Sequence, residues 1–141
     1  MGNKQSIKKL NYEDIQVAIS NSEQYVLINT LPPNEQDCLI FNTVNIKNEE
    51  KIINIHLNNT HKTCNIIVYG KNSNDESVYN KYNQLLLMGF NNVYVYLGGL
   101  FEWLLLQDIY GTINFPSTNE ELDLLKFKPD NNFINKPLLK Y

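Results

Sequence analysis

Two thiols, Cys38 and Cys64, are the most reactive side chains in this sequence. A thiolate can act as a nucleophile, carry a sulfur atom as a persulfide, or bind a soft metal ion. The N-terminus has no apolar signal segment, so we expect a reducing compartment in which both thiols stay free. Free cysteines are usually small buried hydrophobic residues, and Cys38 is the one that we keep as a candidate reactive thiol.

The other side chains with catalytic potential form no recognisable site. His56 and His61 are five residues apart without a cysteine cluster nearby, so we expect no metal site. Ser73 has no identifiable base, which leaves a serine nucleophile unsupported. The sequence contains no arginine, so no bidentate guanidinium clamp is available for a carboxylate, sulfate or phosphate group. We expect no cofactor.

The N-terminus matches the pattern for N-myristoylation, with Gly2 as the acceptor and Ser6 as the second determinant. Lys4, Lys8 and Lys9 follow, and basic charge is the usual second signal because one myristoyl chain binds membranes only marginally. The alternative is an ordinary flexible terminus, and the sequence favours neither interpretation. If Gly2 is acylated, we expect the protein to associate with a membrane surface.

Composition limits the other partners. A chain of 141 residues with 43% hydrophobic residues is enough for one domain with a core of its own. The net charge of −3 and the absence of a basic cluster beyond the first ten residues argue against nucleic acid as a partner. No apolar run approaches the roughly 18 residues of a membrane span, and we expect a cytoplasmic protein.

Short apolar runs alternate along the chain with segments of helical periodicity. Strands are expected at 25–28, 65–69 and 92–96, with a weaker one within 38–46. Helices are expected after Asn11, over 47–58, from Asp75 onward, over 100–106, and briefly from Thr118. This order predicts an α/β fold with a small, mainly parallel sheet that helices cover on both faces.

One segment carries a specific motif. Between Leu86 and Trp103 the chain has Gly89-Phe90, then Val93, then Gly98-Gly99 four residues before the tryptophan. This spacing resembles the pattern G-F-x-x-V followed by G-G-x-x-x-W of the rhodanese-like domain family. The resemblance covers roughly residues 12 to 110. It implies a rhodanese-like domain over residues 11–115, after a flexible segment (1–10) and before an extension (116–141) that packs on the domain.

Two weaker segments fit the same family. Residues 25–29 occupy the place of an apolar strand that ends in aspartate and arginine, and residues 66–69 that of the strand that runs into the active-site loop. In the family, the next residue is the catalytic cysteine. It begins a loop of about six residues whose N–H groups surround the sulfur beside a helix N-terminus.

Here Gly70 stands at the position of that cysteine, and the loop continues with Lys71, Asn72, Ser73, Asn74 and Asp75. None of these residues can carry a sulfane sulfur. The family often has arginine at the end of the loop, where this chain has Asp75. Aspartate is a leading N-cap residue, so we expect Asp75 to accept from the N–H of residue 77 or 78. Its negative charge should also weaken the binding of thiosulfate or phosphate.

Three functions remain open. The first is a catalytically inactive rhodanese-like module that binds a protein partner or regulates it, tethered to a membrane if Gly2 is acylated. The second is a divergent sulfurtransferase that uses Cys38 as a non-standard thiol. The third is a scaffold subunit whose partner docks on the extension after Pro116. The direction in which Cys38 points distinguishes the second function from the first.

Overall fold

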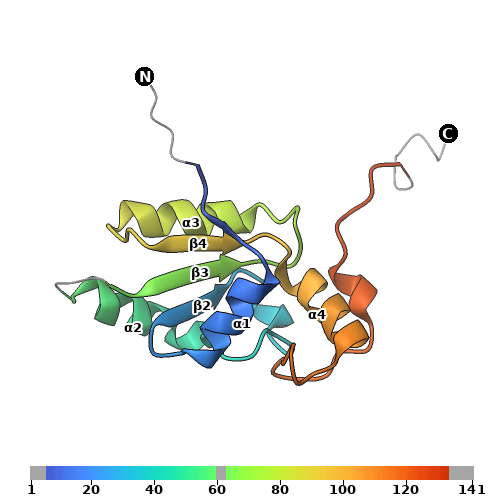
Figure 1. Cartoon of the computed structure of the whole chain (residues 1–141). Coiled ribbons are helices and arrows are strands. Elements are labelled where there is room, and N and C mark those ends of the chain that lie inside the picture. Colours follow the sequence, from blue (N-terminus) through green and yellow to red (C-terminus); the bar gives the residue numbers. More distant parts are fainter. Residues whose placement is uncertain (1–5, 60–62, 134–141) are drawn as a thin grey trace.

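The computed structural model describes residues 6–59 and 63–133 of the chain. Within these residues, four strands form one parallel sheet: β1 (Lys9–Leu10), β2 (Tyr25–Asn29), β3 (Asn65–Tyr69) and β4 (Val93–Tyr96). The strand order is β1-β4-β3-β2, so β3 and β4 are central and the short β1 lies at one edge (Figure 1). The predicted α/β class and the three main predicted strands are confirmed.

Helices cover both faces of the sheet, as the sequence predicts. On one face lie α1 (Tyr12–Ser20) and α4 (Gly99–Tyr110), and on the other lie α2 (Ile46–Leu57) and α3 (Ser77–Leu87) (Figure 1). Each face has its own hydrophobic cluster. Because strand side chains alternate, Ile67 of β3 packs toward α1 and α4, while Ile66 and Val68 pack toward α2 and α3. The apolar residues of β3 are therefore buried on both faces of the sheet.

The first helix begins as its sequence predicts. Asn11 Oδ1 accepts from the N–H of Glu13 at 2.9 Å and of Asp14 at 3.2 Å. In return, Asp14 Oδ2 accepts from the N–H of Asn11 at 3.0 Å, which completes a capping box. The cap fixes the chain direction between the edge strand β1 and the start of α1.

Three local features differ from the sequence-based expectations. The flexible segment expected over residues 1–10 does not include Lys9 and Leu10, which pair with β4. Residues 38–46 form no continuous strand but two isolated bridges, one parallel between Thr43 and Leu27 of β2 and one antiparallel between Ile40 and Ser117. No helix starts at Thr118, whose N–H donates to Leu39 O at 2.8 Å; 3-10 turns occur at Pro33–Glu35 (η1) and Leu124–Phe127 (η2).

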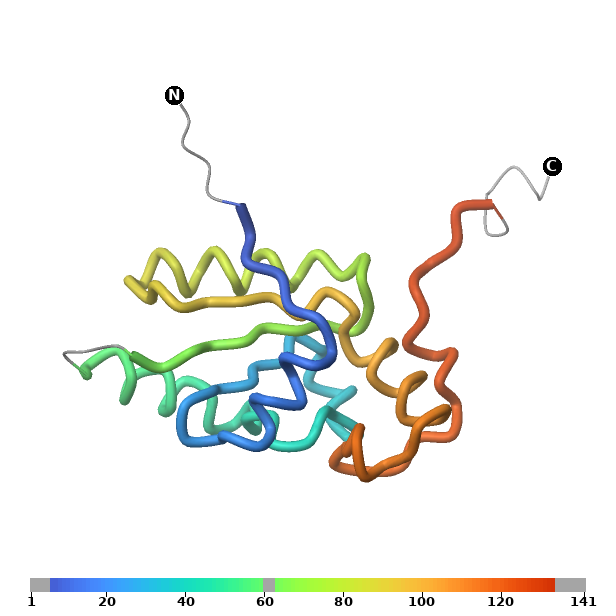
Figure 2. The backbone as a smooth tube through the Cα atoms, viewed as in Figure 1, coloured from blue at the N-terminus to red at the C-terminus, as the bar shows by residue number. Residues whose placement is uncertain are grey.

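Residues 116–133, which we call the C-terminal segment, follow α4, and the η2 turn within them packs against that helix (Figure 2). Phe127 is only 3% exposed and belongs to the same cluster as Trp103 of α4. The indole N–H of Trp103 donates to Pro116 O at 2.9 Å. The segment thus contributes to the hydrophobic core. No helix among the described residues has the length and apolar character that a membrane crossing requires.

Candidate functional site

The candidate site is the loop of residues 70–76 that joins β3 to α3, which we call the 70–76 loop. It lies at the carboxyl end of a central strand, the edge at which parallel sheets commonly bind ligands. The N-terminus of α4 holds it in place. The N–H of Leu100 donates to Gly70 O at 2.9 Å, and the N–H of Phe101 donates to Lys71 O at 2.9 Å. The loop is therefore in contact with the first turns of both α3 and α4.

The second glycine of the G-G motif makes this contact sterically possible. Gly99 has a φ of +67°, a backbone conformation that residues with a side chain rarely adopt. A Cβ at this position would lie 2.7 Å from Gly70 O and 3.0 Å from Asn72 N. The motif that suggested the family thus allows α4 to approach the backbone of the candidate site.

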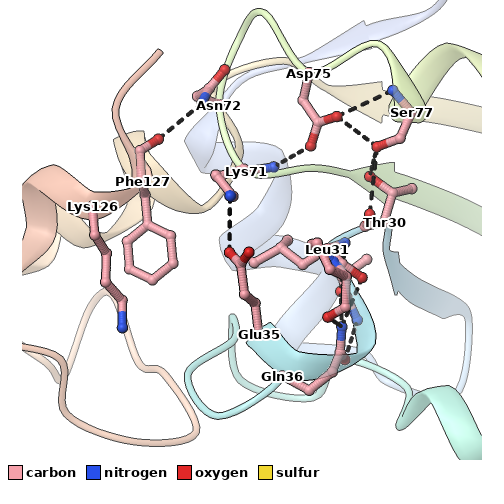
Figure 3. A network of polar contacts seen from close by, with 12 residues as sticks. Thr30, Leu31, Glu35, Gln36, Lys71, Asn72, Asp75, Ser77, Lys126 and Phe127 are labelled. Carbon is pink, nitrogen blue, oxygen red and sulfur yellow. Dashed lines mark hydrogen bonds and ion pairs between the residues drawn. The ribbon is translucent and has the colours of Figure 1, made fainter. Parts of the chain in front are cut away.

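Asp75 closes the 70–76 loop with both of its carboxylate oxygens (Figure 3). Its Oδ1 accepts from the N–H of Ser77 at 3.1 Å and from Ser77 Oγ at 2.6 Å. Its Oδ2 accepts from the N–H of Lys71 at 2.9 Å. The bond with the N–H of residue 77 is the one that the capping interpretation predicts, although Glu76 holds the N-cap position of α3. The bond across the loop to Lys71 was not predicted.

Gly70 is buried, and the space beside it is filled. A Cβ at Gly70 would lie 2.5 Å from Val78 Cγ2, 2.6 Å from Asp75 Oδ2 and 2.9 Å from Asp75 Cγ. These separations are far shorter than a van der Waals contact between such atoms. A side chain of any kind at position 70 therefore requires Asp75 and Val78 to move.

Asn72 links the 70–76 loop to the C-terminal segment (Figure 3). Its side chain is buried, and its Nδ2 donates to Phe127 O at 2.9 Å. Its Oδ1 accepts from the N–H of Asn74 at 2.9 Å. Sequence reasoning placed Asn72 in the loop but gave no sign of its contact with Phe127, because the two residues lie 55 positions apart.

A cleft of about 570 Å³ opens over the loop, with the C-terminal segment as one of its walls. Its lining has charges of both signs: Lys71, Asp75, Glu76, Lys126, Lys128 and Asp130. Two of the lysines are already paired, Lys71 with Glu35 at 2.9 Å (Figure 3) and Lys126 with Glu121 at 2.5 Å. The cleft is therefore polar, without the cluster of free positive charge that would favour a multivalent anion.

A neutral pair lies where the resemblance implies a charged residue at the end of β2. Asn29 is 3% exposed and exchanges two hydrogen bonds with Gln36, at 2.8 and 3.0 Å. Its Oδ1 also accepts from the N–H of Leu31 at 3.0 Å. These bonds fix the turn after β2 without a carboxylate or a guanidinium group.

Cys38 is buried, and its sulfur points toward the C-terminal segment. Its Sγ lies 3.2 Å from Asn119 O, and the side chain belongs to the core cluster on the α1 and α4 face. Cys38 is not among the residues that line the cleft over the 70–76 loop. Burial raises the pKa of the Cys38 thiol, which reduces its thiolate fraction at neutral pH.

The remaining sequence candidates are dispersed. Cys64 precedes β3, at the end of the strand opposite Gly70, and burial raises the pKa of its thiol. Ser73 is exposed at the tip of the loop. Among the described residues, no three His, Cys, Asp or Glu side chains are grouped for a metal ion. Three candidates, Gly2, Lys4 and His61, lie outside the described residues.

Known proteins share this fold at low sequence identity. The Alr3790 protein from Anabaena sp. is 19% identical with a TM-score of 0.55, over 83% of this chain and 97% of that one. An As/Sb reductase from Leishmania major is 16% identical with a TM-score of 0.55, over 77% and 81% of the two chains. The BH2092 protein from Bacillus halodurans is 15% identical with a TM-score of 0.54, over 74% of each chain.

A comparison with curated proteins gave no match. The family model described as "Rhodanese-like domain" matches residues 13–106, which include the 70–76 loop and the G-G motif. That span is two thirds of the chain and contains α1 except its first residue, all but the short edge strand of the sheet, and most of α4. By this match and by its fold, the chain belongs to the rhodanese-like domain family.

Proposed function

We propose that this chain is a rhodanese-like binding module without sulfur-transfer activity. The observation that carries the proposal is Gly70, which directly follows β3, where the resemblance to the family implies the catalytic cysteine. Glycine has no atom that can hold a sulfane sulfur, and no other residue of the 70–76 loop is a thiol. The module therefore acts on a protein partner through binding, without turnover of its own.

Transfer of sulfur from thiosulfate to cyanide tests this proposal. We expect the wild-type chain, at concentrations at which an active rhodanese gives a clear signal, to produce thiocyanate only at the rate of a buffer blank. The Cys38→Ser/Cys64→Ser double variant should give the same background. Thiocyanate production by the wild type above the blank would contradict the proposal, whether or not the double variant retains it.

A sulfurtransferase that uses Cys38 is the alternative enzyme. One similar structure is an As/Sb reductase, so the fold is compatible with catalysis and the alternative needs its own test. Three features of Cys38 weigh against it: burial, a sulfur directed at Asn119 O, and a raised thiol pKa. Activity that the wild type and the Cys64→Ser variant both show, and that the Cys38→Ser variant lacks, would establish this alternative.

A membrane tether is a separate part of the proposal, and the N-terminal pattern at Gly2 and Ser6 supports it. Near that end, Lys8 already contacts the domain, with its Nζ 3.3 Å from Asn91 O and 5.5 Å from the centre of the Tyr94 ring. We expect coexpression with an N-myristoyltransferase to add one acyl group at Gly2. An intact mass without the acyl increment, or the same increment on a Gly2→Ala variant, would refute it.

A partner that docks on the C-terminal segment would use the exposed side of that segment. Leu122 and Leu125 are 85% and 61% exposed, whereas Phe127 of the same segment is buried. Deleting everything after Pro116 would remove a part of the core together with any docking surface. Leu122→Asp separates the two roles, because a docking role predicts lost partner recovery at an unchanged melting temperature. Recovery equal to that of the wild type would exclude docking through this leucine.

A further inference from the structure

We infer that the site is closed from within, because the carboxylate of Asp75 occupies the space of the cysteine side chain that the resemblance implies and accepts from two N–H groups, those of Lys71 and Ser77, that an external anion would need. The inference deepens the proposed function by naming what fills the site. It also stands on its own evidence, since sulfur transfer through Cys38 would leave the occupancy of the 70–76 loop unchanged.

The Asp75 carboxylate lies where a side chain of residue 70 would begin. The Cβ that a cysteine would place at residue 70 falls 2.6 Å from Asp75 Oδ2 and 2.9 Å from Asp75 Cγ. Two atoms of the carboxylate therefore overlap the start of a side chain at position 70. The Asp75 carboxylate can take this position only because Gly70 has no side chain. A side chain at position 70 would in turn fit only if the carboxylate moved away.

The second evidence is the pattern of donors. A bound anion at the N-terminus of a helix accepts from backbone N–H groups that point at it. Asp75 accepts from two such groups on opposite sides of the loop, those of Lys71 and Ser77, and from the hydroxyl of Ser77. An ordinary capping aspartate needs only the bond to the helix. The bond to Lys71 makes Asp75 an occupant of the whole loop.

Two further N–H groups of the loop and the ammonium group of Lys71 already have partners. The N–H of Asn74 donates to Asn72 Oδ1, and that of Asp75 donates to Asn72 O, so four N–H groups of the site have acceptors within it. The ammonium group of Lys71 is paired with Glu35. An incoming anion would have to displace the Asp75 carboxylate, and the lysine of the loop itself is already paired and could not compensate for the repulsion.

Anion binding to a set of variants tests the inference. We propose to titrate the ¹⁵N-labelled chain with sodium thiosulfate at constant ionic strength and to follow the N–H signals of Lys71 and Ser77. Asp75→Ala removes the carboxylate, Asp75→Asn keeps its volume without its charge, and Glu76→Gln removes one charge from the exposed neighbouring residue. The last variant is the matched control, because the Glu76 side chain makes no capping hydrogen bond.

We expect saturable shifts at Lys71 and Ser77 in Asp75→Ala, and none in the wild type, Asp75→Asn or Glu76→Gln. Saturation in the wild type would overturn the inference, because the site would be open. Equal binding by Asp75→Asn and Asp75→Ala would overturn it too, since charge and not occupancy would then exclude the anion. Binding by Glu76→Gln, or no binding by a folded Asp75→Ala, would have the same consequence.

A stability measurement keeps the inference testable if Asp75→Ala disturbs the loop. Gly70→Ala adds only the Cβ whose contacts are described above, so its effect should depend on Asp75. We expect the melting temperature of Gly70→Ala/Asp75→Ala to lie above the value that the two single shifts predict by addition. Val78 contributes equally to both Gly70 variants and cancels in the comparison. Strictly additive shifts would show that the carboxylate does not fill the space beside Gly70.

Discussion

Truncation of Phe127 measures how firmly the C-terminal segment holds its wall of the cleft. The ring of Phe127 is buried among core residues of the α1 and α4 face, while its carbonyl oxygen accepts from Asn72. Phe127→Ala removes the ring and leaves the backbone bond available. Replacing a buried phenylalanine by alanine costs about 3–5 kcal/mol of folding free energy. At about 3 °C per kcal/mol for a chain of this length, the melting temperature should fall by roughly 10–15 °C.

A second outcome follows from the position of the segment near the end of the chain. If the C-terminal segment can detach while the sheet stays folded, the global loss cannot exceed the free energy of docking. Hydrogen exchange then reports the detachment directly. The N–H of Phe41 donates to Pro116 O, and that of Thr118 donates to Leu39 O, so both amides should lose protection in Phe127→Ala.

Urea unfolding together with hydrogen exchange distinguishes these outcomes, with Leu125→Ala as the matched control. Leu125 belongs to the same 3-10 turn but is 61% exposed, so its truncation should change stability by no more than about 0.5 kcal/mol. The reasoning fails if Phe127→Ala costs less than about 1 kcal/mol and the two amides keep wild-type protection. The C-terminal segment would then not be anchored by this ring.

Three further predictions concern the thiols, the motif glycine and the amide pair. Burial raises the pKa of the Cys38 and Cys64 thiols, so iodoacetamide should alkylate both more slowly at pH 7.5 than it alkylates free cysteine. The alkylation rate should still rise above pH 9, and a plateau below pH 8 would contradict this prediction. Gly99→Ala should lower the free energy of unfolding in urea by about 2 kcal/mol or more, because backbone strain adds to the clash with Gly70 O. A loss below about 0.5 kcal/mol would show that the contact relaxes easily. Asn29→Asp should destabilise the fold by about 1–3 kcal/mol at pH 7, since burial raises the folded-state pKa of the new carboxyl. This loss of stability should be absent below about pH 4 and should grow as the pH rises through the raised folded-state pKa of the carboxyl. A pH-independent loss would point to another cause.

Local sequence patterns were enough to predict the framework that positions the site. The apolar run at 65–69 and the cap at Asn11 are decided by neighbouring residues, and the structure has both. In each case the determining interactions lie within a few residues or follow from a regular period, which a single sequence displays directly.

The long-range contacts of the site could not be predicted in the same way. Cys38 meets Asn119 across 81 positions, and Asn72 meets Phe127 across 55 positions, so neither pairing leaves a periodic signal. The expected strand within 38–46 is reduced to two isolated bridges, because the segment divides its pairing between Leu27 of β2 and the distant Ser117. The capping role of Asp75 was visible as a residue preference, but its bond to Lys71 depends on the closed loop conformation.

The occupied loop changes what a restored cysteine would do. A thiol at position 70 has to share its space with Asp75 Oδ2 and Val78 Cγ2, so it would be displaced from the N–H groups that stabilise a thiolate. A carboxylate that close would also disfavour the charged form of the thiol and raise its pKa. Gly70→Cys alone should therefore yield a weak nucleophile. Removal of the Asp75 carboxylate in the same chain should lower the thiol pKa, because the N–H groups of Lys71 and Ser77 would then face the sulfur.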